Sequence, residues 1–353
     1  MARCRALTFS ALLLLGAVSI AGAAVAGTSN PDISAIGQLI ANRTDDASSD
    51  HCGSTVLSLG ETELVLDSYL NPYARGFFVF SIGDDGLETE EAYITIFKGL
   101  PGGVALKGGK YRLGFGKLNA AHPHTYPFIE PPRVIAAMLP GEDGFNDVAA
   151  EVSVLLPTPG SWASILSADV IGGSTFHPDE TASRPGWVAH WSNSFLAAGD
   201  TPVEIGVSAA GGTTDAQRAM RTLVFGADAK TKLALASQTQ LILQAEYLVN
   251  NGRVLADSSS GRAVTETRRG FYAFADMRYR QRYEAGVIYD RYEPRGGGAA
   301  EEAIKCFLGY SLLEETTVFR LAYEAYMPGG ASTVQTITLQ ALFSMGPHKA
   351  HQF

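Results

Sequence analysis

Hydrophobic and polar residues alternate with a period of two along most of the chain, from residue 33 to residue 345. The alternation forms about sixteen short segments, which are separated in turn by tight turns and by longer loops. In such a segment one face is apolar and the other polar, as in a transmembrane barrel whose strands contact lipid outside and a lumen inside. The pattern therefore predicts an all-β fold, a transmembrane antiparallel β-barrel of about 16 strands.

The predicted strands are bounded by Gly, Pro, Asn and Asp, which supply turn conformations. An even number suits a single-chain bacterial barrel, in which both termini lie in the periplasm. The alternation is weakest in the first strand and clearest in the last. In chain order the strands are 33–43, 62–70, 74–82, 90–98, 104–115, 147–156, 163–171, 186–196, 202–210, 219–229, 239–249, 269–278, 282–292, 303–312, 316–326 and 333–344.

The lengths of the connections between strands indicate which end of the barrel faces the periplasm and which faces the outside of the cell. Those after even-numbered strands are short, such as 71–73 and 279–281, whereas several after odd-numbered strands are long, such as 44–61 and 116–146. Barrels of this class have short periplasmic turns and longer extracellular loops. The connection 116–146 is therefore predicted to be a long extracellular third loop.

The start of the chain predicts export. Arg3 and Arg5 precede an apolar run over 6–20, and Ala24-Val25-Ala26 forms an A-x-A site, so residues 1–26 are typical of a secretory signal peptide. An uncleaved anchor is the weaker alternative, because the run is shorter than the roughly 18 apolar residues that a spanning helix needs. Residues 27–353 are predicted to form a single outer-membrane β-barrel domain with a short tail at 346–353. The expected location is the bacterial cell outer membrane, after signal-peptide export.

Composition excludes several other classes of protein. The chain is 46% hydrophobic and 18% charged, yet no other long apolar run follows the signal segment, and alternating strands account for this balance. Without Arg3 and Arg5 the chain has 25 basic residues of its 27 against 36 acidic ones, so nucleic acid is not an expected partner. Cys52 and Cys306 are too few for a disulfide framework.

The strand faces predict which charges line the lumen. In the last strand Ile337, Leu339 and Phe343 share an apolar face that should contact lipid. Arg or Lys on a lipid face costs about 2–4 kcal/mol near the bilayer midplane, so charges in the middle of strands are expected to point inward. They could form ion pairs that solvate the lumen or could select solutes, and the pattern leaves both open. The strand residues expected to line the pore are Arg75, Lys107, Arg278, Lys305, Arg320 and Glu324.

Aromatic residues near strand ends have a separate interpretation. Tyr69, Tyr272, Tyr289 and Tyr326 occupy such positions. We expect them to form girdles at the membrane interfaces, with a binding platform as the alternative.

The loop 116–146 contains the least usual chemistry. Lys117, His122, His124, Glu130 and Arg133 lie among prolines at 123, 127, 131, 132 and 140. Prolines restrict the backbone, so the loop can hold one shape without regular hydrogen bonding. These five residues are therefore the candidates for a constriction inside the barrel.

His122 and His124 also raise the alternative of a metal site, because imidazole is a common ligand and the carboxylate of Glu130 lies close in sequence. One His-x-His pair is not a full ligand set, and His348 and His351 are expected at the periplasmic end. No metal and no cofactor is therefore predicted. No phosphate-binding loop and no Ser, His and Asp set stands out, so the chain is not expected to be an enzyme.

Several motifs resemble a known group of proteins. They are NPDIS at 30–34, DSYLNPYAR at 67–75, LPGGVALKGGKYRLGFG at 100–116, the two-histidine segment 117–127 and GEDG at 141–144. Together they resemble an uncharacterised family of bacterial outer-membrane barrels, similar to phosphate-selective (O/P-type) porins and sometimes labelled TonB-dependent receptors. TonB-dependent receptors resemble 22-stranded barrels with a plug domain, and few residues here precede the first strand. The resemblance implies a diffusion channel, with anions as one class of solute.

The expected function is a porin-like outer-membrane channel for passive diffusion of small hydrophilic solutes or ions, with the loop 116–146 as its constriction. The alternative is a closed structural or adhesive barrel that acts through its extracellular loops. The expected partners are outer-membrane lipid, small solutes or ions, and the outer-membrane assembly machinery, whose signal the C-terminal Phe353 resembles. A homotrimer is what the resemblance to sixteen-stranded porins implies.

Overall fold

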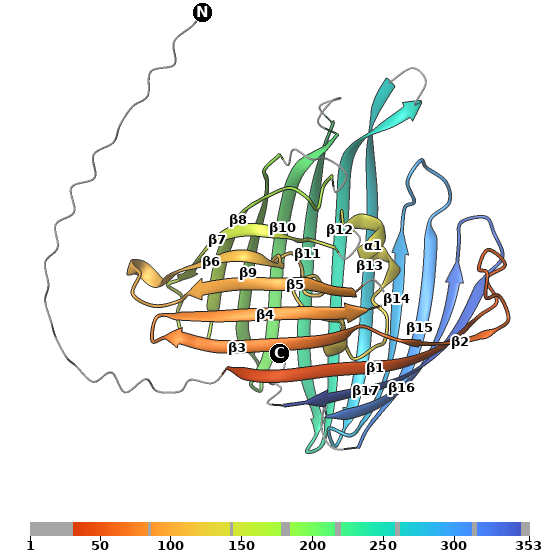
Figure 1. Ribbon diagram of the computed structural model, residues 1–353, viewed down its shortest axis with the longest axis horizontal. Helices are drawn as coiled ribbons and strands as arrows, with labels where there is room; N and C mark the ends of the chain where they lie inside the picture. Colours follow the sequence, from red (N-terminus) through yellow and green to blue (C-terminus); the bar gives the residue numbers. More distant parts are fainter. Residues whose placement is uncertain are drawn as a thin grey trace, which may run out of the picture. The chain divides into compact units, whose positions relative to one another are not determined.

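The computed structural model describes residues 31–83, 86–141, 144–177, 184–215, 220–257, 262–312 and 316–346. The predicted signal peptide and the tail residues His348, His351 and Phe353 lie outside these ranges and stay predictions. The described strands form one antiparallel sheet, in which consecutive strands pair except that β2 and β3 both pair with β1. The first and last strands also pair, so the sheet closes into a barrel (Figure 1).

The strands cover most of the described chain. In order they are β1 Asp32–Thr44, β2 Thr55–Leu59, β3 Thr62–Asn71, β4 Ala74–Gly83, β5 Gly86–Ile96, β6 Val104–Arg112, β7 Asn146–Leu156, β8 Ala163–Ile171, β9 Gly186–Ala197, β10 Thr201–Asp215, β11 Met220–Ala236, β12 Thr239–Asp257, β13 Arg262–Tyr279, β14 Tyr283–Tyr292, β15 Glu301–Ser311, β16 Thr317–Met327 and β17 Val334–Met345. The short helical segments are η1 Pro101–Gly103, η2 Pro123–Thr125 and α1 Arg133–Met138. Within the described residues, no helix is long and apolar enough to cross a bilayer.

The barrel has sixteen strand positions, because β2 and β3 share one of them. The first half of β1 pairs with β3 and its second half pairs with β2. The break between them lies at Gly60, whose N–H donates to the Gln38 carbonyl at 3.0 Å. The predicted sixteen-stranded closed barrel is confirmed, but the expectation that 44–61 is wholly a loop is wrong. The five residues of β2 are too few to show a period of two above the surrounding polar sequence.

The sequence predicts which strands exist better than it predicts where they begin and end. Every predicted strand is present, but β10 to β13 have 15, 17, 19 and 18 residues and extend beyond their predicted ends. Beyond the lipid both faces of a strand can be polar, so the alternation that marks a strand disappears there. The fifth predicted strand is too long instead, because β6 ends at Arg112 and the chain then turns into the barrel.

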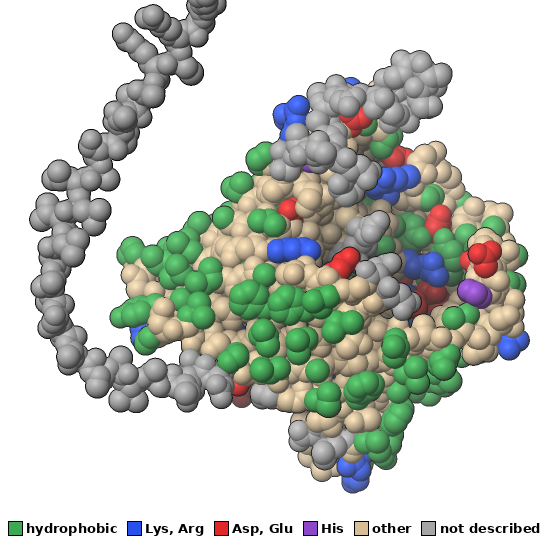
Figure 2. Space-filling view, viewed as in Figure 1, with side chains coloured by type: hydrophobic (Ala, Val, Ile, Leu, Met, Phe, Trp, Pro, Cys, Tyr) green, Lys and Arg blue, Asp and Glu red, His purple; other side chains and the backbone are tan. Residues whose placement is uncertain are grey.

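The faces follow the predicted alternation. In β17 Ile337, Leu339 and Phe343 are 48%, 52% and 46% exposed, whereas Thr338 and Gln340 are each only 5% exposed. Figure 2 shows that apolar side chains gather on the outer surface in the same way over the strands at the front of the barrel. This outer apolar surface is what contact with lipid requires.

The third loop, 116–146, folds into the barrel and supplies much of its core. Pro123 is the first residue of η2, where the fixed φ of proline suits the first turn, and Pro132 is the N-cap of α1. The helix α1 contacts β12, β13 and β14 (Figure 1). Buried apolar residues of the loop pack against inward-facing strand residues in one cluster, which includes Leu118, Tyr126, Phe128, Val134, Met138, Leu248, Phe274 and Phe307.

Candidate functional site

The third loop enters the barrel through a tight turn at Gly116. Gly116 has φ +63°, which strains any other residue, and a Cβ at this position would lie 2.2 Å from Oε2 of Glu246 and push that carboxylate away. The carboxylate of Glu246, on β12, is 3% exposed and accepts hydrogen bonds from the backbone N–H groups of Lys117 at 2.7 Å and Leu118 at 2.9 Å. The hydroxyl of Tyr272 donates to the same oxygen at 2.6 Å. One buried carboxylate therefore holds the start of the loop.

Two of the tyrosines assigned to interfacial girdles lie elsewhere. Tyr272 is fully buried inside the barrel, because its hydroxyl finds Glu246 and Gln244 as partners there. The ring of Tyr326 lies 3.9 Å from the guanidinium carbon of Arg133, on the loop inside the barrel. The girdle prediction is wrong for both, since proximity to a strand end does not reveal which face a tyrosine occupies.

Arg133 and its neighbour Pro131 connect the middle of the loop to strands β14, β15 and β16. Its Nε and Nη2 donate to the two carboxylate oxygens of Glu324, on β16, at 2.8 and 2.7 Å. Its backbone N–H donates to Asp290, on β14, at 3.2 Å. Lys305, on β15, donates to the carbonyl of Pro131 at 2.8 Å and pairs with Glu324 at 3.2 Å. Three neighbouring strands thus hold one short stretch of the loop.

The carbonyls at the end of α1 are also satisfied by the barrel wall. Asn250, on β12, donates to the carbonyl of Met138 at 2.7 Å, and Arg268, on β13, donates to that of Ala137 at 2.8 Å. The last carbonyls of a helix carry partial negative charge, so the cation of Arg268 is well placed there. Together with Arg133, these contacts fasten the loop along β12 to β16.

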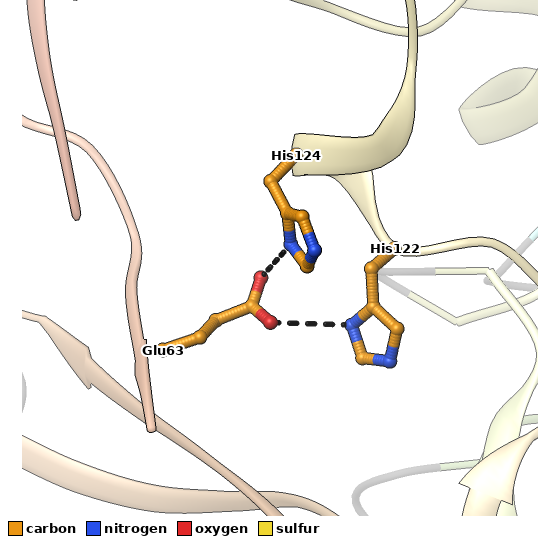
Figure 3. Close-up of side chains that lie close together, drawn as sticks. All are labelled: Glu63, His122 and His124. Carbon is orange, nitrogen blue, oxygen red and sulfur yellow. Dashed lines mark hydrogen bonds and ion pairs between the residues drawn. The ribbon is translucent and has the colours of Figure 1, made fainter. Parts of the chain in front are cut away.

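His122 and His124 fasten the loop to the other side of the barrel. Nδ1 of His124 lies 2.8 Å from Oε1 of Glu63, on β3, and Nε2 of His122 lies 2.9 Å from Oε2 of Glu91, on β5. Figure 3 shows both imidazoles directed at Glu63, with Nδ1 of His122 at 3.5 Å from its Oε2. Glu130, expected beside the histidines, is instead an exposed residue that lines a small pocket with Lys305 and Glu324. The carboxylate beside the histidines is therefore that of Glu63, and not that of Glu130 as their proximity in sequence predicted.

A β-bulge brings a further carboxylate to the histidines. The pairing of β4 with β5 shifts register at Val79 and Phe80, so one residue of β5 is extra. As a result the consecutive Glu90 and Glu91 are both buried, at 8% and 5% exposure. Glu90 forms an ion pair with Arg112. A strict alternation would have placed one of these two charges on the lipid face.

Negative charge dominates around His122. Burial by itself lowers the pKa of His122, but the hydrogen bond to Glu91 and the nearby Glu63 and Glu90 outweigh it and raise the pKa. Glu61, in the break between β2 and β3, has a pKa raised to about 7 by burial and then by the charges of Glu90 and Glu63. The neighbouring carboxylates contribute to both shifts, and they favour positive charge here.

Beside this cluster lies a polar cavity of about 310 Å³. Nζ of Lys107, on β6, projects between two aromatic rings, 3.8 Å from the centroid of Tyr111 and 4.0 Å from that of Tyr93. A cation over aromatic faces is attracted by their quadrupoles. Within the described residues no carboxylate forms a salt bridge with Lys107. The lining consists of Phe77, Glu91, Tyr93, Lys107, Arg112, Gly114, Ala120, His122 and Glu151.

The other predicted pore residues are inside the barrel and paired with carboxylates. Arg75 and Arg320 reach carboxylates on other strands, Arg278 pairs within β13, and Lys117 pairs from the loop with a strand, at distances from 2.5 to 2.8 Å. The pairs are Arg75 with Asp67, Lys117 with Glu204, Arg278 with Asp276, and Arg320 with Glu284. Ion pairing, the first of the two interpretations left open by the sequence, describes these cations.

Comparisons with known proteins identify the fold. No family model matches the chain. A protein of Aquifex aeolicus, described only as uncharacterised, is 27% identical over 333 residues, which cover 84% of this chain and 70% of that protein.

Solved structures of bacterial outer-membrane proteins are similar over nearly their whole length. The outer-membrane channel DcaP of Acinetobacter baumannii has a TM-score of 0.61 at 13% identity, with 92% of this chain and 100% of that chain covered. An anion-selective porin of Comamonas acidovorans has a TM-score of 0.60 at 11% identity, with 90% and 100% covered. OmpF of Salmonella typhi has a TM-score of 0.62 at 8% identity, with 90% and 98% covered. The chain therefore has the fold of a bacterial outer-membrane porin.

Proposed function

We propose that this barrel is a channel for passive diffusion of small hydrophilic solutes or ions, narrowed by the third loop, 116–146. The observation that carries the proposal is the position of the loop inside the barrel. It is fastened at Glu246 and Glu324 on one side and at Glu63 and Glu91 on the other. A loop held at opposite walls sets the width of the space that remains beside it.

Lys107 and Arg133 are the cations that we propose to favour anions. Lys107 lines the cavity and meets aromatic rings rather than a carboxylate among the described residues. Arg133 is paired with Glu324, yet its side chain is still 35% exposed. Positive groups on a pore wall lower the electrostatic barrier for anions. The name of the Comamonas acidovorans porin describes the same preference for that protein.

Single-channel recording in planar bilayers tests this proposal. We expect the wild-type barrel to conduct, and the double variant Arg133→Ala with Lys107→Ala to show a reversal potential shifted toward weaker anion preference. The matched control is Arg291→Ala with Lys98→Ala, which removes the same charge from exposed positions at a strand end and in a turn. Unchanged selectivity in the Arg133 and Lys107 variant would reject the assignment.

A closed barrel that acts through its extracellular loops is the second candidate. The observation that favours it is the extent of the loop's apolar packing, in which residues such as Phe128 and Met138 are buried in the barrel interior. Well-folded protein that produces no conducting events would support the closed barrel and refute the channel.

We further propose that the barrel is a homotrimer and a distant relative of phosphate-selective porins. The sixteen-stranded porin fold supports both, and the motif segments 67–75 and 100–116 support the relation. Sedimentation velocity of the protein in detergent gives the oligomeric state, and a single species of monomer mass would contradict the trimer.

A further inference from the structure

We infer that His122, His124 and Glu63 form a binding site for a divalent transition metal ion, with Glu90 as a further donor. Each of the first three residues offers a ligand atom, and these atoms all lie within 4.8 Å of one another. Glu90 offers a carboxylate oxygen within the same distance of Glu63. The histidines come from the third loop and Glu63 from β3 (Figure 3), while Glu90 comes from β5, so the site exists only in the folded barrel.

Three atoms of the cluster are buried without a hydrogen-bond partner. They are Oε2 of Glu63, Nδ1 of His122 and Oε2 of Glu90. Buried polar atoms in folded proteins nearly always have a partner, so three orphans in one place indicate a missing ligand. The side chain of Glu63 is only 2% exposed, and Figure 3 shows it directed at both imidazoles.

The spacing of two of these atoms suits a metal ion. Nδ1 of His122 and Oε2 of Glu63 are 3.5 Å apart. Ligand atoms at about 2.1 Å from a tetrahedral zinc ion lie roughly 3.4 Å from one another. A metal ion bound between the two atoms would therefore require little movement of either.

The second nitrogen of His122 already has the partner that a metal ligand needs. Its Nε2 lies 2.9 Å from Oε2 of Glu91, and a carboxylate there orients the ring and makes the opposite nitrogen a better donor. Glu90 is held by Arg112. The imidazoles stack at 5.6 Å between centroids, so both are fixed in place.

Charge and donor type indicate which ions fit. Four carboxylates gather here, those of Glu61, Glu63, Glu90 and Glu91. Among the described residues, Arg112 pairs with Glu90 and Lys107 lies near Glu91, so a divalent ion would offset the negative charge that remains. Imidazole nitrogen with carboxylate oxygen suits zinc and similar transition metals, whereas calcium and magnesium prefer oxygen ligands alone. His122 also lines the 310 Å³ cavity, which supplies a route for the ion.

Zinc titration of the full-length barrel in detergent tests the inference independently of channel activity. The protein is stripped with a chelator, titrated with ZnCl₂ and passed through a desalting column, and zinc is measured by mass spectrometry. We expect about one zinc ion per chain, and an affinity at least ~10-fold lower for His122→Gln and for Glu63→Gln. The matched control, His51→Gln, removes an exposed histidine outside the cluster and should leave the affinity unchanged.

Two further measurements keep the result decisive. Cobalt in place of zinc should show visible absorption bands that disappear in His124→Gln, which a merely structural role of His124 would not produce. Heat-dependent electrophoretic mobility shows whether each variant is folded. Glu91→Gln keeps all proposed ligands but removes the partner of His122, so it should lower zinc affinity by roughly 10- to 100-fold. The inference is overturned if folded His122→Gln and Glu63→Gln bind zinc as wild type does. It is also overturned if no zinc binds, or if calcium binds equally well.

Discussion

Replacing Glu246 with alanine should release the start of the third loop from the barrel wall. The carboxylate is buried on β12 and accepts from two backbone N–H groups, those of Lys117 and Leu118, and from the hydroxyl of Tyr272. In Glu246→Ala none of these donors keeps its acceptor. Among the described residues no ion pair involves Glu246, so the variant releases the loop without breaking one.

The magnitude follows from the buried donors. Leaving a buried donor unsatisfied costs about 1–3 kcal/mol, so two N–H groups represent roughly 2–6 kcal/mol. The N–H of Lys117 is only partly buried and can be reached by water, which places the expected cost near the lower end, about 2–3 kcal/mol. Because 1.4 kcal/mol is a factor of ten, the population with an undocked loop should rise by roughly 30- to 150-fold.

Cysteine labelling measures that population. Leu118 is 4% exposed, so Leu118→Cys should react slowly with a bulky maleimide while the loop is docked. The native Cys52 and Cys306 are exposed and are replaced by serine in every variant. When opening is faster than reaction, the labelling rate follows the open population. Tyr272→Phe removes only the hydroxyl donor and should raise the rate far less.

This reasoning would be refuted if folded Glu246→Ala protein were labelled at the same rate as protein that keeps Glu246. It would mean that the apolar packing of residues such as Phe128 holds the loop and that the hydrogen bonds to Glu246 add nothing measurable.

Two substitutions elsewhere test the turn into the barrel and the outer face. Gly116→Ala should also raise the labelling rate at Leu118→Cys, because the new Cβ would clash with Glu246 and the φ of +63° is strained for alanine; a rate equal to that of the glycine parent would contradict this. Leu339→Arg should lower the free energy of unfolding in lipid vesicles by about 2–4 kcal/mol, measured by denaturant titration, because residue 339 faces lipid. Gln340→Arg is the inward-facing control, and equal losses for the two would show that the faces are wrongly assigned.

The sequence alone determined the number of strand positions in the barrel and the faces of most strands. Side chains on a strand alternate between two faces, so a residue's face depends on its immediate neighbours, as in β17. The same local signal placed Arg320 and Glu324 inside, and the structure finds both buried. It also marked 116–146 as the long stretch without a strand period, which is the loop that folds into the barrel.

The partners of that loop were decided only by the tertiary structure. His124 meets Glu63 from 61 positions away, and Arg133 meets Glu324 from 191 positions away. No local pattern encodes such distances, because they depend on how the closed sheet brings its strands around the loop. For the same reason Glu130, the carboxylate near the histidines in sequence, is not the one beside them in space.

Features that depend on local irregularity or on contacts between strands could not be predicted from the sequence either. The bulge in β5 turns two consecutive glutamates to the same side, and a period of two predicts the opposite. Tyr272 lies on the inward face that alternation from Arg278 gives, but only the structure shows the buried carboxylate on the adjacent strand that accepts its hydroxyl hydrogen. The sequence thus determined the wall of the barrel, which repeats a local rule, whereas the contents of its lumen depend on contacts between residues far apart in the chain.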